Sequence, residues 1–145
     1  MIILDAYAAL ALLRDEPAAQ QVQDLIESGE ETALTLLGVA EVLDRLVRRA
    51  GIDEAQARLD LAQLALPAPP ALDRQLAASA GLLRARHYHR RTRALSLADC
   101  VATETARRLG APLATADPAL LETCEAEGIA VIALPGSGAG SAPSR

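Results

Sequence analysis

Two aspartates follow short apolar segments that have the composition of buried strands. Asp5 comes directly after Ile2-Ile3-Leu4, and Asp117 comes just after Leu113-Ala114-Thr115. The carboxyl ends of neighbouring parallel strands lie ~4.8 Å apart, so two such carboxylates could share one cation. The structural alternative is that each aspartate only caps a helix, and the Pro118 after Asp117 favours that alternative there.

For two further acids, the neighbouring residues give weaker support for a metal-binding role. Ser96 and Asp99 form the Ser-x-x-Asp pattern of a capping box. This is compatible with metal binding, because both roles place the carboxylate at a helix N-terminus near the strand ends. Glu41 lies off the apolar stripe of its helix, and by itself it is better explained as a solvated partner of Arg45, four residues later.

Acids spread over a whole chain suit a site that the fold assembles. Carboxylates held close together repel one another, and a hard divalent cation relieves that repulsion. A bound Mg²⁺ or Mn²⁺ can polarise a phosphodiester, activate a water molecule and stabilise the leaving oxygen. The chemistry that these residues suggest is therefore metal-assisted hydrolysis of a phosphodiester.

The elements that must position these acids alternate between helix and strand, with Gly and Pro at their ends. The expected strands cover residues 2–4, 33–36, 113–115 and 129–134, with a possible short edge strand at 66–70. The expected helices cover residues 6–13, 17–27, 53–64, 71–86, 96–110 and 118–128, with another from about 39 to 50. Helices and strands at such short spacing imply parallel pairing through right-handed crossovers.

The expected fold class is therefore α/β. One domain would cover residues 1–134, with a small, mostly parallel sheet flanked by helices. Residues 135–145 consist mainly of Gly, Ser, Ala and Pro, and are expected to be a disordered tail. Ligands of such folds bind outside the carboxyl ends of the strands, where Asp5 and Asp117 are expected.

The composition argues against several other classes of protein. The 145 residues are 51% hydrophobic, which is enough for one buried core, and the net charge is −5. Tyr7 and Tyr88 are the only aromatic residues, so surfaces that stack on bases are nearly absent. Cys100 and Cys124 are expected to be small buried side chains rather than a disulfide framework. No secretory leader and no apolar run of ~20 residues is visible, so a cytoplasmic protein without membrane contact is expected.

Four segments of the chain resemble PIN-domain toxins of the VapC type, from type II toxin–antitoxin systems. They are Ile2-Ile3-Leu4-Asp5-Ala6-Tyr7 and its continuation to Pro17, Val39-Ala40-Glu41-Val42-Leu43, Leu95-Ser96-Leu97-Ala98-Asp99-Cys100, and Leu109-Gly110-Ala111-Pro112-Leu113-Ala114-Thr115-Ala116-Asp117. In the last segment a Thr precedes the Asp by two residues, as in the family. The match covers residues 1 to about 134, in order and with family-like spacing.

The resemblance implies a PIN-like nuclease domain that is a Mg²⁺- or Mn²⁺-dependent endoribonuclease. It also implies a homodimer and a VapB-like antitoxin whose C-terminal segment covers the site. By position, Asp5, Asp99 and Asp117 would hold the metal, and Glu41 would be a further ligand or would orient water. Ser96 and Thr115 would support these acids or contact phosphate.

One position departs from the family. Toxins of this type commonly have a small hydroxyl residue two positions after the first Asp, and this chain has Tyr7. The bulk of Tyr7 could narrow the site or change substrate access. No ligand role is therefore assigned to it.

A basic segment precedes Asp99. Residues 74–98 contain six Arg and two His but no acid. As a group, its arginines form a candidate RNA-contacting patch beside an acidic site, and the alternative is a solvated helix end and loop. The candidate RNA-binding residues are Arg84, Arg86, Arg90, Arg91 and Arg93. The pair His87 and His89 is not assigned to a metal, because a transition-metal site would need further soft ligands nearby.

The main hypothesis is a metal-dependent endoribonuclease that acts as the toxin of a toxin–antitoxin pair. A non-catalytic PIN-like module that binds RNA or a protein partner is the alternative, and Tyr7 is the feature that keeps it open. A small phosphatase or receiver-like domain would need a Lys near the phosphate, and the chain has none.

Overall fold

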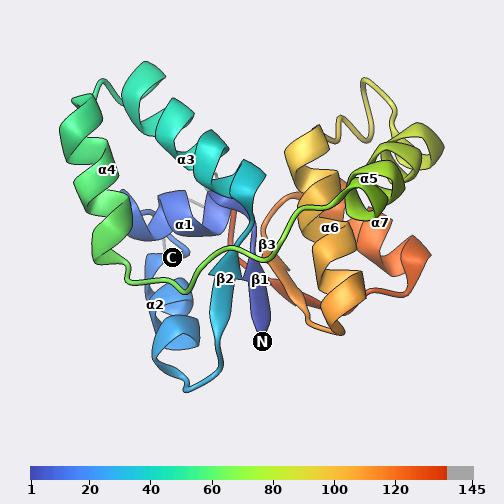
Figure 1. The fold of residues 1–145 in the computed structure, drawn as a ribbon, viewed down its shortest axis with the longest axis horizontal. Coiled ribbons are helices and arrows are strands. Elements are labelled where there is room, and N and C mark those ends of the chain that lie inside the picture. The colour runs from blue at the N-terminus through green and yellow to red at the C-terminus, as the bar shows by residue number, and fades with distance from the viewer. Residues whose placement is uncertain (137–145) are drawn as a thin grey trace, which may run out of the picture.

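The computed structural model describes residues 1–136 of the chain. Figure 1 shows a small central sheet with one group of helices on each side. The expected tail over 135–145 lies almost wholly outside the described residues. No helix within residues 1–136 has both the length and the apolar character that a membrane span requires.

The sheet has four short strands, and all of them are parallel. They are β1 (Ile2–Leu4), β2 (Thr32–Leu34), β3 (Leu113–Thr115) and β4 (Val131–Ala133). Their order across the sheet is β2-β1-β3-β4. Ile3 pairs with Ala33 on one side and with Leu113 on the other, so β1 is a central strand. The predicted α/β class with a small parallel sheet is confirmed.

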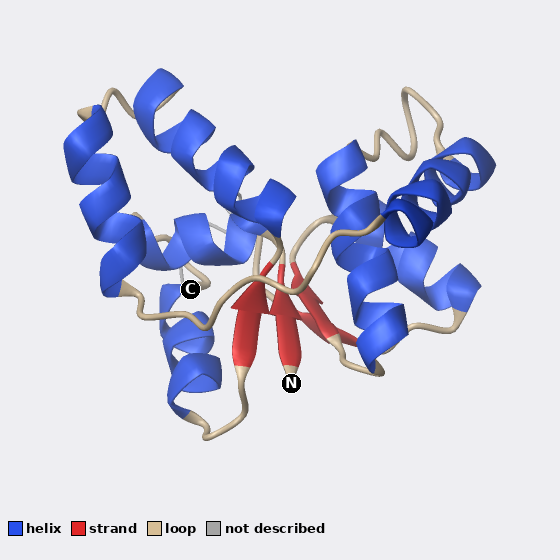
Figure 2. Cartoon of the chain, viewed as in Figure 1, coloured by secondary structure: helices blue, strands red, loops and turns tan. Residues whose placement is uncertain are grey.

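Seven helices within residues 1–136 connect and cover these strands. They are α1 (Ala6–Leu13), α2 (Ala19–Glu27), α3 (Leu36–Arg48), α4 (Glu54–Gln63), α5 (Arg74–His87), α6 (Leu97–Leu109) and α7 (Pro118–Glu127). Helices α1 to α4 lie on one side of the sheet and α5 to α7 on the other (Figure 1). The arrowheads of the strands in Figure 2 point toward the space between these two groups.

The two groups of helices enclose two hydrophobic clusters that share the central strand. Ile2 and Leu4 pack with Val22 and Val42 on one face of the sheet. Ile3 packs with Leu113 on the other face. Alternate residues of a strand point to opposite faces, so a strand that is buried on both faces must be apolar at every position. This explains the uninterrupted Ile2-Ile3-Leu4 run.

Several boundaries differ from those predicted. β2 ends at Leu34, rather than at Leu36, because the Thr35 hydroxyl accepts a hydrogen bond from Gly38 N and starts α3. α5 begins at Arg74, rather than at Ala71, because the Asp73 side chain accepts from Leu76 N and caps it there.

The bounds of other elements also differ from those predicted. α2 begins at Ala19 and not at Pro17, and β4 is shorter than the expected 129–134. Residues 66–70 form no strand, and Figure 1 shows this stretch as the coil that leads from α4 across to α5. Its three prolines lack the N–H that a ladder needs.

The two cysteines have the predicted structural role. Cys100 and Cys124 are fully buried and unpaired. Burial raises the pKa of each thiol to about 11, so both remain protonated and unreactive near neutral pH.

Candidate active site

The four predicted acids line one cavity of about 480 Å³ at the carboxyl edge of the sheet. Asp5 follows β1 and Asp117 follows β3, and these strands are neighbours. Asp99 comes from the first turn of α6, and Glu41 comes from α3. The remaining lining residues are Ala6, Tyr7, Arg45, Ala94, Ser96, Ala116, Pro118 and Gly136.

Asp5 is the most buried of the four acids, with 5% of its surface exposed. Its Oδ1 accepts a hydrogen bond from Ala8 N at 2.8 Å, which caps α1. Its Oδ2 accepts from the Thr115 hydroxyl. Burial raises the pKa of Asp5 to about 7 against the lowering effect of these two hydrogen bonds, and the nearby Asp99 and Asp117 raise it further.

Thr115 connects two of the acids. Its fully buried hydroxyl donates to Asp5 Oδ2 and accepts from Asp117 N at 3.0 Å. A single side chain thus ties the end of β1 to the turn that follows β3. The Thr two residues before Asp117 therefore holds the first and last acids in register.

Asp99 and Asp117 both cap helices, as the structural alternative proposed, and both also line the cavity. Asp99 Oδ2 accepts from Ser96 N at 2.9 Å, and Ser96 Oγ accepts from Asp99 N at 3.0 Å, which completes the capping box. Asp117 Oδ1 accepts from Ala119 N at 2.9 Å. Burial raises the pKa of Asp99 against the effect of its hydrogen bonds with Ser96, and Asp117 raises it further. Capping and lining the site are therefore compatible in both residues.

Glu41 also combines its two possible roles. Its Oε1 accepts from Arg45 at 2.9 Å, four residues along α3, and its side chain is 21% exposed. Burial raises the pKa of Glu41, Arg45 lowers it, and Asp99 raises it. Its carboxylate is thus close enough to Asp99 for repulsion while an arginine holds it in place.

The donor set fits a hydrated magnesium or manganese ion. Within residues 1–136, no three Asp, Glu, His or Cys side chains converge closely enough to coordinate one ion directly. Mg²⁺ commonly keeps several waters and uses only one or two carboxylates. Asp99 and Asp117 each have one carboxylate oxygen without a protein donor among the described residues, whereas Asp5 uses both. All of these donors are oxygen, which suits a hard cation.

The predicted arginine patch is divided by contacts within the chain. Arg84 donates to Leu95 O at 2.8 Å and lies over the Tyr88 ring. Arg86 pairs with Glu127. None of the five predicted RNA-binding arginines lines the acid cavity.

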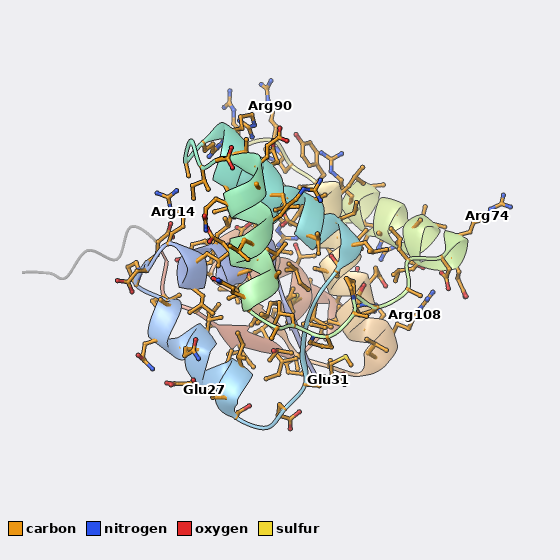
Figure 3. The ribbon with its side chains drawn as sticks, turned by 60° about the vertical axis from the view of Figure 1, so that its left-hand side comes forward. Arg14, Glu27, Glu31, Arg74, Arg90 and Arg108 are labelled. Carbon is orange, nitrogen blue, oxygen red and sulfur yellow. The ribbon has the colours of Figure 1, made fainter. Side chains whose placement is uncertain are left out.

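The other three arginines of the patch lie in or beside a short loop. Arg93 pairs with Glu122. Arg90 and Arg91 are exposed and have no ion pair within residues 1–136. Figure 3 shows Arg90 extending away from the ribbon.

Two further residues surround the acids on the α1 and α3 side: Tyr7, whose bulk was expected to narrow the site, and Arg45, which sequence reasoning missed. Tyr7 lines the cavity, and its hydroxyl donates to Pro135 O at 2.9 Å, just before the lining residue Gly136. Burial raises the pKa of Tyr7, as do Glu16 and Asp5. Arg45 was considered only as an ion-pair partner, although it also lines the cavity. The i, i+4 spacing of Glu41, Arg45 and Arg49 was the signal available in the sequence.

Comparison with known proteins identifies the family of the chain. The PIN domain model matches residues 2–126 of the chain. No curated protein sequence matches significantly.

Solved structures with the same fold include VapBC2 from Rickettsia felis bound to a DNA fragment from its promoter. It has 13% identity and a TM-score of 0.69, covering 92% of this chain and 99% of that one. A toxin–antitoxin complex from Klebsiella pneumoniae has 17% identity and a TM-score of 0.58, covering 81% and 87%. FitAcB from Neisseria gonorrhoeae has 21% identity and a TM-score of 0.54, covering 91% and 96%. The family match over most of the chain, together with this shared fold, shows that the chain belongs to the PIN domain family.

Proposed function

We propose that the protein is a Mg²⁺- or Mn²⁺-dependent endoribonuclease and the toxin of a toxin–antitoxin pair. The observation that carries the proposal is the meeting of Asp5, Glu41, Asp99 and Asp117 in one cavity at the carboxyl edge of the sheet. PIN domains are generally nucleases, which supports hydrolysis of a nucleic acid. The motif resemblance to VapC-type toxins supports RNA as the substrate.

In this proposal Asp5, Asp99 and Asp117 hold the metal through oxygen atoms, partly by way of water. When bound there, the metal would supply polarisation of the phosphodiester and activation of a water molecule. The chain holds the acids in place beforehand, because Ala8 N and the Thr115 hydroxyl fix both oxygens of Asp5. Because these contacts hold the Asp5 carboxylate in place before the substrate binds, the site needs less reorganisation during the reaction.

Glu41 has the position and basicity to orient the attacking water. Arg45 holds its Oε1, and no protein donor within residues 1–136 reaches its Oε2. That oxygen can accept a hydrogen bond from water, and the raised pKa of Glu41 makes it a better proton acceptor.

Three further parts of the proposal concern the surroundings of the enzyme. A VapB-like antitoxin is supported by the fold shared with VapBC2 and with the toxin–antitoxin complex from Klebsiella pneumoniae. Its action on cellular RNA would place the protein in the cytoplasm. A homodimer is supported by the motif resemblance to VapC-type toxins. Light scattering after gel filtration tests the dimer.

The central test is cleavage of total RNA in Mg²⁺ with and without EDTA. Asp99→Asn and Asp5→Asn should abolish cleavage while the far-ultraviolet circular dichroism stays unchanged. Asp44→Asn is the matched control, because Asp44 is on α3 but does not line the cavity. Cleavage that survives Asp5→Asn, or that is indifferent to EDTA, would contradict the proposed function.

A module that binds without cutting is the second candidate. One observation favours it: the cavity has Tyr7 on its wall, where the family commonly has a small hydroxyl residue. Calorimetric titration with Mn²⁺ separates the two functions. The nuclease requires saturable Mn²⁺ binding that Asp99→Asn weakens, whereas the module requires none.

A further inference from the structure

A second cavity, of about 320 Å³, adjoins the acids between α1 and α3. It is lined by Tyr7, Leu10, Arg14, Glu16, Arg45, Arg49 and Ala50. Tyr7 and Arg45 line both cavities, so the two share a wall. We call this second cavity the arginine groove.

The arginine groove is locally basic in an acidic protein. Its lining has three arginines and one acid, Glu16. Arg14 and Arg49 are exposed and have no ion pair within residues 1–136. Arg45 is bound to Glu41 by one terminal nitrogen. By contrast, Arg48 on the same helix donates to both carboxylate oxygens of Asp44, from Nε to Oδ1 and from a terminal nitrogen to Oδ2. The groove therefore presents guanidinium groups that the folded chain does not neutralise.

The arginines extend away from the acids in steps. Arg45 and Arg49 are one turn apart on α3, which is a rise of ~6 Å and comparable to the spacing of successive phosphates along an extended strand. Arg14 reaches the same groove from the end of α1, and Figure 3 shows it extending outward from the ribbon. Phosphate is one of the two anions, with carboxylate, that planar guanidinium groups bind through paired N–H···O bonds.

We propose that the arginine groove binds the phosphates that flank the cleavage site of the RNA strand. Arg45 contacts the phosphate next to the acids, and Arg49 and Arg14 contact those farther along. This assignment rests on the proposed ribonuclease function. It replaces the 84–93 segment as the main RNA track, because Arg84, Arg86 and Arg93 already have partners in the chain, and because Arg90 and Arg91 line neither the acid cavity nor the arginine groove.

A structural role is the competing explanation for two of these residues. Arg14 is the C-cap of α1 and Arg49 is the C-cap of α3, where cations stabilise the helix dipole. That role predicts a loss of stability on substitution and no change in RNA binding. Binding and urea unfolding are therefore measured on the same variants.

The experiment measures binding of a fluorescent single-stranded RNA by anisotropy from 50 to 200 mM salt. All variants carry Asp5→Asn, so that the probe is not cut. The test variant is Arg14→Gln with Arg49→Gln. The matched control is Arg48→Gln with Arg74→Gln, which removes the same charge from outside the groove. Arg14→Lys with Arg49→Lys restores charge in the groove.

Affinity falls as salt rises, and each phosphate contact to a single strand adds about 0.7 to the steepness of log affinity plotted against log salt. Loss of two contacts should therefore make the plot less steep by ~1.4. The ratio of the parent's affinity to that of the test variant should then change about sevenfold between 50 and 200 mM salt. The control should keep the parent slope, and the lysine variant should recover most of it. Equal slopes for the test and control variants would overturn the assignment, as would a loss of stability without a change in RNA binding. Binding of a peptide partner in the groove that leaves RNA binding unchanged would overturn it too.

The same variants separate this inference from the proposed function. In the chain with Asp5 intact, the groove variant should raise KM and leave kcat nearly unchanged. If the groove variant shows the predicted change of slope but the chain with Asp5 intact never cuts RNA, the ribonuclease proposal fails while the groove assignment stands. If the chain with Asp5 intact cuts RNA, and the groove variant has an unchanged slope and KM, the groove assignment fails alone.

Discussion

Replacement of Asp5 by Asn should stabilise the metal-free protein at alkaline pH, although it removes an essential acid. The pKa of Asp5 is about 7 in the folded chain, against an ordinary 3.8, because of its burial. The folded state therefore binds this proton more tightly than the unfolded state does. The stabilising contribution is complete below pH ~4 and is lost as the pH rises toward 7.

The size of the effect follows from the same two pKa values. Relative to pH values below ~4, the raised pKa of Asp5 destabilises the folded chain by roughly 2 kcal/mol at pH 5, where Asp5 must take up a proton on folding, and by roughly 4 kcal/mol at pH 8, where it is buried ionised. Asn has the same shape and no charge, so it avoids this cost at every pH. The stability advantage of Asp5→Asn over the parent should thus grow by roughly 2.5 kcal/mol from pH 5 to pH 8. A pH-independent cost of altered hydrogen bonding to Thr115 leaves this difference unchanged.

Urea unfolding in EDTA, followed by far-ultraviolet circular dichroism, measures the difference. Asp44→Asn is the control, because Arg48 lowers the pKa of Asp44 and its substitution should give no such gain at high pH. Saturating Mg²⁺ at pH 8 should stabilise the parent, by ~2.7 kcal/mol at one hundred times Kd, and should have a smaller effect on Asp5→Asn. A stability difference that stays constant between pH 5 and pH 8 would refute the reasoning.

Three further substitutions test the contacts around the site, each by its urea midpoint. Thr115→Val should cost ~1–3 kcal/mol, because Asp117 N loses its acceptor, whereas Thr115→Ser should cost less; equal losses would show that the hydroxyl is unimportant. Ser96→Ala should cost ~0.5–2 kcal/mol by breaking the capping box, and no loss would mean that the cap is redundant. Tyr7→Phe should cost at most ~1 kcal/mol, because its bond to Pro135 O is exposed; a greater loss would point to a larger role for the C-terminal segment.

The local chemistry of the sequence was sufficient for most elements. Gly110 and Gly128 both have the positive φ of a helix C-cap, and Ser96 forms the predicted capping box. These features depend on residues three or four positions apart, so a single sequence contains the information. The boundary errors at β2 and α5 came from the caps Thr35 and Asp73, which are local too but were not recognised.

The placement of the acids depended on both the sequence and the tertiary structure. The strand ends predicted that Asp5 and Asp117 would be neighbours, because parallel strands bring their carboxyl ends to one edge. For Glu41 the sequence favoured only an ion pair with Arg45. Packing of α3 against the other elements decided that this pair would also face Asp99.

The arginines show which contacts could not be predicted from the sequence. Clustering along the chain suggested a patch at 84–93, yet Arg86 and Arg93 pair with acids 41 and 29 residues away on α7. The arginine groove joins Arg14 to Arg45 and Arg49 from separate helices. Which charges are neutralised and which remain free depends on contacts between distant segments. Only the tertiary structure determines these contacts, because packing brings the partners together without any local pattern.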